Sequence, residues 1–459
     1  MKKRRHIVPS VPGFTSLFKG GYAQVFREDA TGLVCKRLEK FAAAADEDGL
    51  ANYSTMVDII FMKSLRPLDG TPNVVDVQHG PRYVDVYMKH HGATLTQWMR
   101  KTEAPERARH APHILHALWS IIMQMYCNGC MHTDVKPCNI LIEAPPDGGD
   151  VAVTLIDYNC MTVVDATPAG FKYAPAVGTW SHAAPEVVFH EQPYPQSPSW
   201  SLALVAVALY DRYPISPRLT HDPQGFWYTD NKSWRRIYNA LMEAHPGGLP
   251  LAASLEADMG KPLFECVKQS LRWRPEERPL LKKWSPGAVP TPAPVWHVLD
   301  RTIDPTTVAP DVRAAAVGRM YQLSAACTKP TWFCHAVTLY DACSKKLKER
   351  HPAGCLAAAC WSIAGYLHND YVADDAATGK MLAELLPGGE TGRELTRLVY
   401  QVGEDQAYRC WLKPVDVRLM ERVGAARPTS LEWLRDQWLA VDRPYTLQIL
   451  AERWARMIV

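Results

Sequence analysis

Apolar and polar positions alternate with a period of two over much of the first ninety residues. The alternating runs cover residues 14–18, 22–28, 33–38, 74–80 and 83–89. Turns at Gly20–Gly21 and Thr31–Gly32 separate the first three runs, which is typical of β-hairpins. Between the third and fourth runs, residues 50–65 have the apolar spacing of a helix. We therefore expect a small antiparallel sheet and one helix.

After these runs the pattern becomes mostly helical. Helical spacing covers residues 95–101 and 113–129, and a glycine ends the second helix. Two β-rich apolar runs, 139–144 and 151–157, flank a Pro/Gly/Asp turn and predict a hairpin. Residues 201–210 are apolar on every side, so we expect a buried central helix there.

A proline-rich stretch, Ser285–Val295, divides the chain. Its four prolines are incompatible with a helix or a central strand, so it predicts a semi-rigid linker. The helical patterns beyond it cover residues 312–327, 331–350, 353–367, 378–386 and 392–402. The expected organisation is an α+β domain at 1–288, a linker at 289–304 and an all-α domain at 305–459.

Composition excludes several classes of protein. Of the 459 residues, 47% are apolar and 22% charged, which is typical of globular domains rather than disordered chains. The formal net charge of +3 is too small to indicate a nucleic-acid partner, and none is expected. No apolar run approaches the roughly 20 residues that span a bilayer, so no membrane association is expected either.

The cysteines and the first residues bear on location. The twelve cysteines lack metal-ligand spacing, since Cys127 and Cys130 form one pair and no second pair follows at zinc spacing. Without a recognisable signal peptide, reduced buried thiols are favoured, and we expect an intracellular protein in the cytoplasm or nucleus. The basic run Lys2–Arg5 is compatible with a nuclear import signal, but a solvated terminus is the favoured interpretation.

Six polar residues follow one another in the order that a phosphoryl-transfer site requires. They are Lys36 on a strand-like run, Asp58 on the next helix, Asp134, Lys136 and Asn139 in one short loop, and Asp157 after a strand. Transfer of a γ-phosphoryl group needs a cation on the phosphates, metal ligands, and a carboxylate that orients the attacking hydroxyl. Each residue alone is a weak signal, but the ordered set indicates such a site.

The motifs around these residues resemble those of the eukaryotic-type protein kinase superfamily, and in some details its cyclin-dependent branch. The matching segments are FKGGYAQVF at 18–26, VCK at 34–36, HTDVKPCN at 132–139, DYN at 157–159, GTWSHAAPE at 178–186 and RWRPEERP at 272–279. The resemblance covers residues 14–284. It implies a bilobal protein kinase fold, with lobes at 14–90 and 91–288.

The resemblance also implies an ATP site. Lys36 is expected to hold the α- and β-phosphates and to pair with Asp58, which stands where a Glu is usual. Gly20, Val25 and Met88 are expected to contact the nucleotide. The implied cofactors are ATP and Mg²⁺, and the implied partner is a protein substrate.

The catalytic roles follow from the same resemblance. Asp134 is implied as the catalytic base and Lys136 as a contact of the γ-phosphate, while Asn139 and Asp157 are implied as magnesium ligands. For His132, a packed core position is favoured over acid/base chemistry.

Several positions depart from the kinase pattern. Phe18 and Ala23 replace glycines of the phosphate loop, which should stiffen its backbone. Asp58 is one methylene shorter than Glu, so its ion pair requires a closer helix. Asn159 replaces a glycine, and asparagine tolerates a positive φ better than most residues. Near Trp200, the Asp that usually braces the catalytic loop is absent.

The activation segment differs as well. Thr133 replaces the arginine that usually receives an activation-loop phosphate, so a phosphate on Thr162 or Thr167 would have no obvious cationic partner. We expect no dependence on phosphorylation there. Glu186 is expected to pair with Arg278, as in the family.

The C-terminal domain resembles a cyclin box over residues 305–418. Its first three helical patterns follow in the cyclin order, and Ala358, Ala359 and Ala364 match the tightly packed third helix. Cyclins commonly grip their kinase with a Lys on that helix and a later Glu, but here Tyr366 stands near the Lys position and no clear Glu follows. An unrelated helical bundle is the alternative.

These observations predict a Ser/Thr protein kinase activated in cis by a fused cyclin-like domain, at an effective concentration of roughly millimolar. Such a fusion would suit a large DNA virus. The alternatives are a pseudokinase scaffold and a small-molecule phosphotransferase. The altered phosphate loop, Asp58 and the missing brace near Trp200 suggest the scaffold, but the intact residues Lys36, Asp134, Asn139 and Asp157 argue against it. The segment GTWSHAAPE argues against a small substrate, because Thr179 stands where protein kinases orient the substrate loop.

Overall fold

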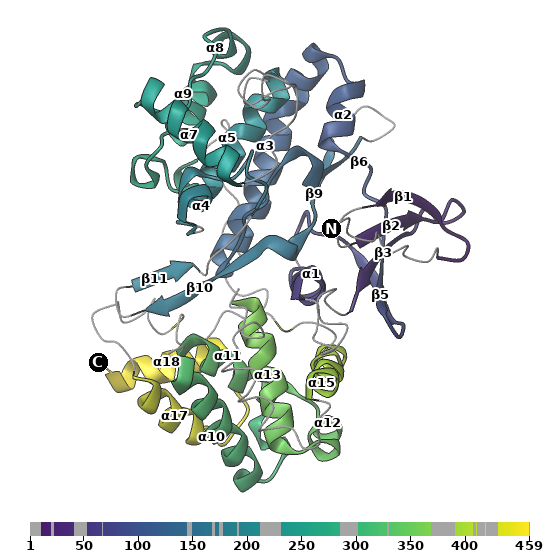
Figure 1. Cartoon of the computed structure of the whole chain (residues 1–459), viewed down its shortest axis with the longest axis vertical. Helices are drawn as coiled ribbons and strands as arrows, with labels where there is room; N and C mark the ends of the chain where they lie inside the picture. Colours follow the sequence, from purple (N-terminus) through teal and green to yellow (C-terminus); the bar gives the residue numbers. More distant parts are fainter. Residues whose placement is uncertain are drawn as a thin grey trace.

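The computed structural model shows a sheet-containing lobe, a helical lobe and a second group of helices below them (Figure 1). The described residues are 11–19, 23–40, 53–66, 68–144, 149–167, 170–173, 178–190, 192–211, 231–284, 302–327, 330–368, 391–406, 410, 418 and 430–458. Gly20, the predicted helix at 378–386 and most of the predicted linker lie outside these residues.

A five-stranded antiparallel sheet with the strand order β1-β2-β3-β5-β4 forms the first lobe. Its strands are β1 Thr15–Lys19, β2 Ala23–Arg27, β3 Val34–Glu39, β4 Val74–His79 and β5 Tyr83–Met88, and the helix α1, Tyr53–Ser64, follows β3. The predicted sheet and its helix are confirmed. Because β3 lies between β2 and β5, Lys36 is central in the sheet, opposite Val25 and Val86.

The second lobe is mostly helical. Its elements are β6 Ala93–Thr94, α2 Leu95–Lys101, α3 Ala104–Cys127, β7 Cys130–His132, β8 Ile140–Glu143, β9 Ala152–Leu155, β10 Met161–Thr167, β11 Gly170–Tyr173, α4 Pro185–His190, α5 Ser197–Asp211, α7 Asn231–Ala244, α8 Ser254–Met259 and α9 Lys261–Ser270. The predicted β8–β9 hairpin is confirmed. So is the buried central helix, since residues 200–209 within α5 are all buried.

The start of α3 corrects the prediction. The spacing placed it at His113, after a proline, but the helix begins at Ala104 and carries Pro112 in its interior. The buried Arg107 stabilises the added turns, because its guanidinium donates to the carbonyls of Thr102 at 3.1 Å and Leu209 at 3.1 Å. Tertiary contacts therefore outweigh the local cost of the proline.

The C-terminal region is helical. Its helices are α10 Pro310–Cys327, α11 Pro330–Ala342, α12 Lys345–Arg350, α13 Ala353–Leu367, α15 Thr391–Asp405, α17 Leu431–Leu439 and α18 Leu447–Ile458. The prediction of a single helix at 331–350 is wrong, because the helix is interrupted between α11 and α12. Ser344 caps α12 by accepting from the Leu347 amide at 3.3 Å, and its own amide donates to Asp405 at 2.7 Å.

A buried ionic network organises this helical region. Arg313 on α10 donates to both carboxylate oxygens of Asp341 on α11 at 2.8 Å each. Arg313 also reaches the Trp438 carbonyl at 2.9 Å, and the Tyr445 hydroxyl donates to Asp341 at 3.1 Å. Since Trp438 and Tyr445 belong to the last part of the chain, the network joins both ends of the helical region.

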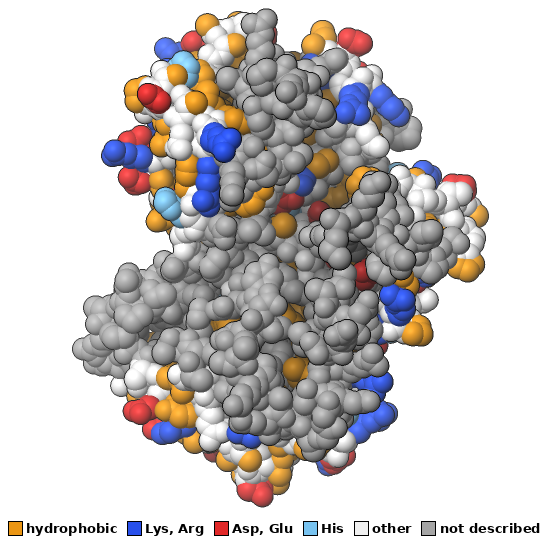
Figure 2. All heavy atoms as spheres, viewed as in Figure 1, with side chains coloured by type: hydrophobic (Ala, Val, Ile, Leu, Met, Phe, Trp, Pro, Cys, Tyr) orange, Lys and Arg blue, Asp and Glu red, His pale blue; other side chains and the backbone are white. Residues whose placement is uncertain are grey.

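The described surface carries both signs of charge. Figure 2 shows Lys and Arg side chains interspersed with Asp and Glu over the helical lobe and the C-terminal helices. Among the described residues, no helix combines the length and the apolar character that a membrane crossing needs.

Replacing Asp341 by Asn tests the network. The buried Arg313 would lose its counter-charge, and breaking a buried pair in this way costs about 3–5 kcal/mol. The expected result is a fall of several degrees in the midpoint of thermal unfolding, which is measured by circular dichroism. Asp436→Asn is the control, because Asp436 forms an exposed pair with Arg435 at 2.8 Å and its loss should barely move the midpoint. Equal midpoints for the two variants would contradict this account.

Candidate active site

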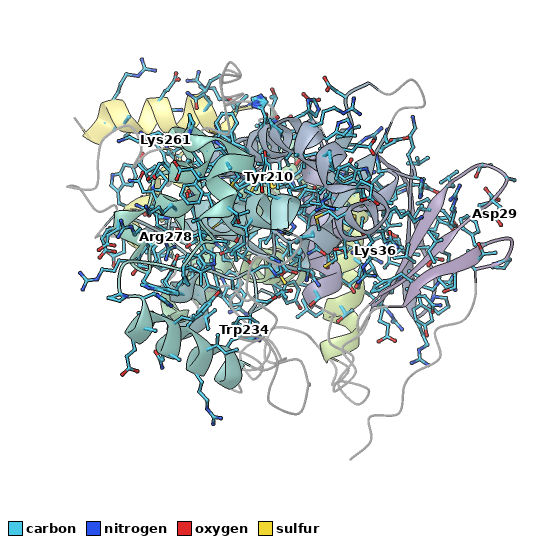
Figure 3. The ribbon with its side chains drawn as sticks, turned by 90° about the horizontal axis from the view of Figure 1, so that it is seen from above. Asp29, Lys36, Tyr210, Trp234, Lys261 and Arg278 are labelled. Carbon is cyan, nitrogen blue, oxygen red and sulfur yellow. The ribbon has the colours of Figure 1, made fainter. Side chains whose placement is uncertain are left out.

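A buried ion pair joins the sheet to α1. Lys36 Nζ lies 2.6 Å from Asp58 Oδ2, and the other oxygen of Asp58 accepts the Tyr158 amide at 3.0 Å. The Asp58 side chain is 1% exposed, so both of its oxygens face partners inside the protein. Figure 3 shows Lys36 where the sheet meets the rest of the molecule.

The helix α1 is buried on every side, which accounts for this close approach. Residues 56–62 are all 2% exposed or less. The helix packs against the turn Tyr158–Cys160 and against α13. The shorter side chain of Asp58 therefore still reaches Lys36.

The charges around Lys36 fix its protonation state. Burial alone would lower the pKa of Lys36, but Asp58 and Asp157 outweigh burial and raise the pKa above the usual 10.5. Asp157 Oδ1 lies 3.2 Å from Nζ. Because the folded pKa is raised, the stabilisation from this cation is fully present below about pH 10.5 and is lost only as the pH rises through the folded value.

The catalytic-loop residues converge on Asp134. Lys136 Nζ lies 2.6 Å from Asp134 Oδ2, and the side-chain nitrogen of Asn139 donates to the main-chain carbonyl of Asp134 at 2.9 Å. The Thr179 amide donates to Asp134 Oδ1 at 2.7 Å. Burial alone would raise the pKa of Asp134, but Lys136 and Thr179 outweigh it and hold the pKa below its usual range. The carboxylate is therefore ionised at neutral pH.

The activation segment closes tightly over this loop at Gly178. A Cβ there would lie 2.6 Å from the Thr133 carbonyl oxygen, so only glycine fits without a shift. Lys136 Nζ also donates to the Thr179 hydroxyl. The end of the activation segment is thus bonded to both charged residues of the loop.

His132 is a packed residue, as its sequence context favoured. It is buried, and its Nδ1 accepts the Asp134 amide at 3.2 Å while its Nε2 lies 3.1 Å from the Ile156 carbonyl. Burial lowers the pKa of His132, which favours the neutral ring. Nε2 then carries the proton and donates to Ile156, so the ring ties the catalytic loop to the strand that precedes Asp157.

The backbone strain lies at Asp157 rather than at Asn159. Asp157 has φ 71 and ψ 71, and among the described residues other than glycine it alone has a positive φ. Asn159 lies in a 3₁₀ turn, Tyr158–Cys160, and does not need the positive φ that a glycine would allow. The strained backbone at Asp157 holds its carboxylate toward Lys36.

Thr133 and Thr162 show how the segment is fixed locally. The Thr133 hydroxyl donates to the Cys160 carbonyl. Thr162 lies on β10, which pairs with β7, and its side chain is fully buried. A kinase therefore could not reach Thr162 in this conformation. The side chain of Thr167 is not among the side chains that the structure describes.

The Glu186–Arg278 pair forms as expected. Arg278 makes two bonds of 2.8 Å to Glu186 and lies 5.0 Å from the centre of the Trp200 ring. Figure 3 shows Arg278 among the helices of the second lobe. Sequence reasoning missed Ser201, whose hydroxyl donates to the His182 carbonyl at 3.1 Å. This serine begins an apolar run and gave no signal of its role.

Two of the expected nucleotide residues, Val25 and Met88, lie on the strands β2 and β5 next to β3. Val25 pairs with Lys36 across the sheet, and Met88 pairs with Val34 at the end of β5, where the chain enters the second lobe. The oxygen donors of Asn139 and Asp157 fit Mg²⁺, which prefers such ligands. Asn139 uses its side-chain nitrogen for Asp134, and its side-chain oxygen accepts a long hydrogen bond of 3.9 Å from the Cys138 thiol, which a cation would displace.

The sequence of this chain is similar to those of known protein kinases. The family model described as the protein kinase domain matches residues 19–284. The chain is 24% identical over 209 residues to proteins named serine/threonine-protein kinase 1 from African swine fever virus, among them Pretoriuskop, Namibian warthog and Badajoz isolates. The match covers 42% of this chain and 60% of those relatives.

Replacing Asp58 by Asn tests the ion pair. Removing the counter-charge lowers the pKa of the buried Lys36, and a fall of about one unit gives a tenfold larger free-amine fraction. We expect Lys36 to be acylated about tenfold faster in this variant than in the wild type at pH 8. The acylation is measured by peptide mass spectrometry. Asp85→Asn is the control, because Asp85 pairs with the neighbouring Arg37 at 2.6 Å. Equal acylation of Lys36 in both variants would refute the assignment.

Proposed function

Because this chain belongs to the protein kinase family, we propose that it transfers the γ-phosphoryl group of ATP to serine or threonine hydroxyls of protein substrates, with Mg²⁺. One observation carries the proposal. Lys36 lies 2.6 Å from Asp58 and 3.2 Å from Asp157, and the loop carboxylate of Asp134 lies 2.6 Å from Lys136. The viral relatives, which are named Ser/Thr kinases, support this acceptor class.

Each residue would act through its charge or, for Asn139, through its side-chain oxygen. Lys36 would bind the α- and β-phosphates, and Asn139 and Asp157 would hold Mg²⁺, which neutralises phosphate charge when bound. Asp134 would orient the acceptor hydroxyl and take its proton, since its lowered pKa keeps it ionised. Lys136 would stabilise the charge of the transferring group.

The activation segment supports a protein substrate. Thr179 bonds Asp134 through its amide and Lys136 through its hydroxyl. The segment on which a substrate chain would lie is therefore fixed directly to the proposed base. A small-molecule phosphotransferase would not need this connection.

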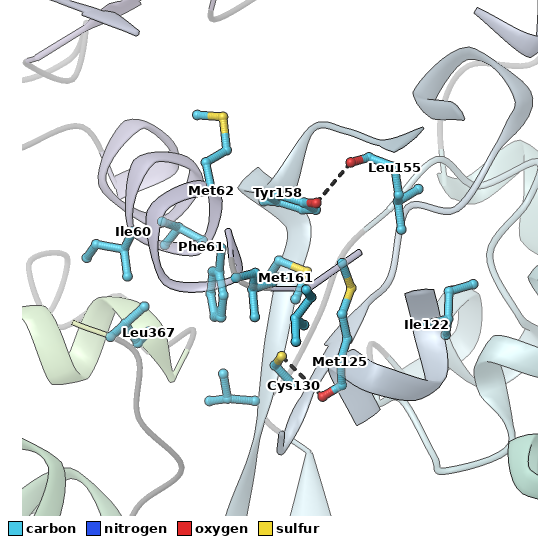
Figure 4. Close-up of a cluster of buried hydrophobic side chains, with 14 of the residues drawn as sticks. Ile60, Phe61, Met62, Ile122, Met125, Cys130, Leu155, Tyr158, Met161 and Leu367 are labelled. Atoms are coloured by element: carbon cyan, nitrogen blue, oxygen red, sulfur yellow. Dashed lines mark hydrogen bonds between the residues drawn. The ribbon is translucent and has the colours of Figure 1, made fainter. Parts of the chain in front are cut away.

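We also propose that the C-terminal helices activate the kinase in cis, as a cyclin-like domain of a cyclin-dependent type of kinase would. α13 packs against α1, and Figure 4 shows Leu367 beside Ile60 in a shared apolar cluster. α11 also contacts β10 of the activation segment. The helical region thus packs against α1, which carries Asp58 of the Lys36–Asp58 pair, and against β10 of the activation segment.

The variant Asp134→Asn tests catalysis. Losing the base should lower kcat about 10²–10⁴-fold, measured as phosphate transfer from labelled ATP to a generic basic protein. Binding of Mg-ATP should persist, because Lys36 is untouched. Asp150→Asn, an exposed site in the same lobe, should remain near wild type. If the wild-type chain binds ATP but transfers nothing, the pseudokinase scaffold replaces this proposal.

The variant Leu367→Ala tests activation in cis. Truncating this buried leucine loosens the support of α1, so kcat/KM should fall about tenfold or more. Leu323→Ala is the control, because Leu323 is equally buried on α10, which packs against α11, α13 and α17. Each variant should lose about 2–5 kcal/mol of stability. Equal loss of activity in the two variants would contradict activation through α1.

A further inference from the structure

A second contact joins the C-terminal helices to the sheet, through α15. The Tyr400 hydroxyl donates to the main-chain carbonyl of Lys40 at 3.1 Å. The Lys40 ammonium lies 5.2 Å from the centre of the Tyr400 ring, and the His79 ring meets the same ring edge-on at 5.6 Å. One turn further along α15, Glu404 Oε1 lies 3.3 Å from His79 Nε2.

Lys40 occupies a sensitive place in the lobe. It directly follows β3, the strand of Lys36, and its amide donates to the Arg82 carbonyl at 2.9 Å. The preceding carbonyl, of Glu39, accepts the Thr55 hydroxyl of α1 at 2.6 Å. Two successive carbonyls at the end of β3 are therefore held by α1 and by α15.

The chemistry of this contact is constant near neutral pH. Tyr400 is 4% exposed, and burial raises the pKa of its phenol, so it remains a hydrogen-bond donor. Burial, aided by the Lys40 charge, lowers the pKa of His79 to about 4. The neutral His79 ring therefore meets Glu404 as a hydrogen-bonding partner rather than as a cation.

We propose that Tyr400 is a positioning residue of the active site. By holding the Lys40 carbonyl it fixes the end of β3, and through β3 the position of Lys36 relative to Asp58. The inference rests on the proposed function, because it assigns Tyr400 a part in the binding of ATP phosphates by Lys36. It also identifies which residues of the helical region grip the sheet, where the expected Lys and Glu of a cyclin are absent.

The test is Tyr400→Phe in the full chain, which removes the hydroxyl and keeps the ring. Losing one such hydrogen bond should weaken Mg-ATP binding about 3- to 10-fold and lower kcat/KM at least as much. Amide hydrogen exchange of residues 34–39 and 53–64 should quicken by a similar factor. Lys40→Met removes only the cation from the ring and should change ATP binding less than about twofold.

Tyr445→Phe is the matched control. Tyr445 is also buried, and its hydroxyl makes a bond of 3.1 Å to Asp341 within the helical region. This variant should destabilise the helices without changing exchange in residues 34–39. Tyr400→Phe with wild-type ATP affinity and unchanged exchange, or with the same profile as Tyr445→Phe, would overturn the inference.

The proposed function and this inference can fail separately. If the wild-type chain transfers no phosphate, hydrogen exchange and Mg-ATP affinity still decide whether Tyr400 positions β3. If transfer occurs but Tyr400→Phe leaves both readouts unchanged, only the role of Tyr400 is lost.

Discussion

The ion pair between Lys36 and Asp58, 2.6 Å long and buried, sets the arrangement of the rest of the molecule. A buried charge pair is favourable only when both partners keep full contact, and aspartate offers a short reach. The pair therefore requires α1 to lie close to the sheet. A helix that is buried on every side can hold such a position only if other elements enclose it, and α13 packs against one of its sides.

The activation segment depends on the same enclosure. It leaves Asp157 through a short turn that packs on α1, forms β10 against β7, and contacts α11. Pairing and packing thus fix residues that many kinases order with a phosphate on the activation loop. The buried Thr162 and the hydroxyl of Thr133 bonded to the Cys160 carbonyl fit an activation mechanism without that phosphate.

Local pattern was sufficient for the five strands of the first lobe, the β8–β9 hairpin and the buried α5 helix, because periodicity and turn residues carry that information. It did not predict β10 and β11 of the activation segment. It failed where distant contacts decide. The start of α3 depends on the hydrogen bond from Arg107 to the carbonyl of Leu209, 102 residues later. The start of α12 depends on the hydrogen bond from the Ser344 amide to Asp405 of α15. The roles of Ser201 and Tyr400 depend on backbone carbonyls, which leave no trace in sequence.

The most direct measurement of the central claim is steady-state phosphate transfer by the purified full chain after phosphatase treatment, with labelled ATP, Mg²⁺, a basic protein substrate and no other protein added. If the chain's own helices hold the Lys36–Asp58 pair closed, phosphoserine or phosphothreonine should form at once and at a constant rate. Transfer that begins only after a second protein is added, or only after phosphorylation of the chain, would contradict the account.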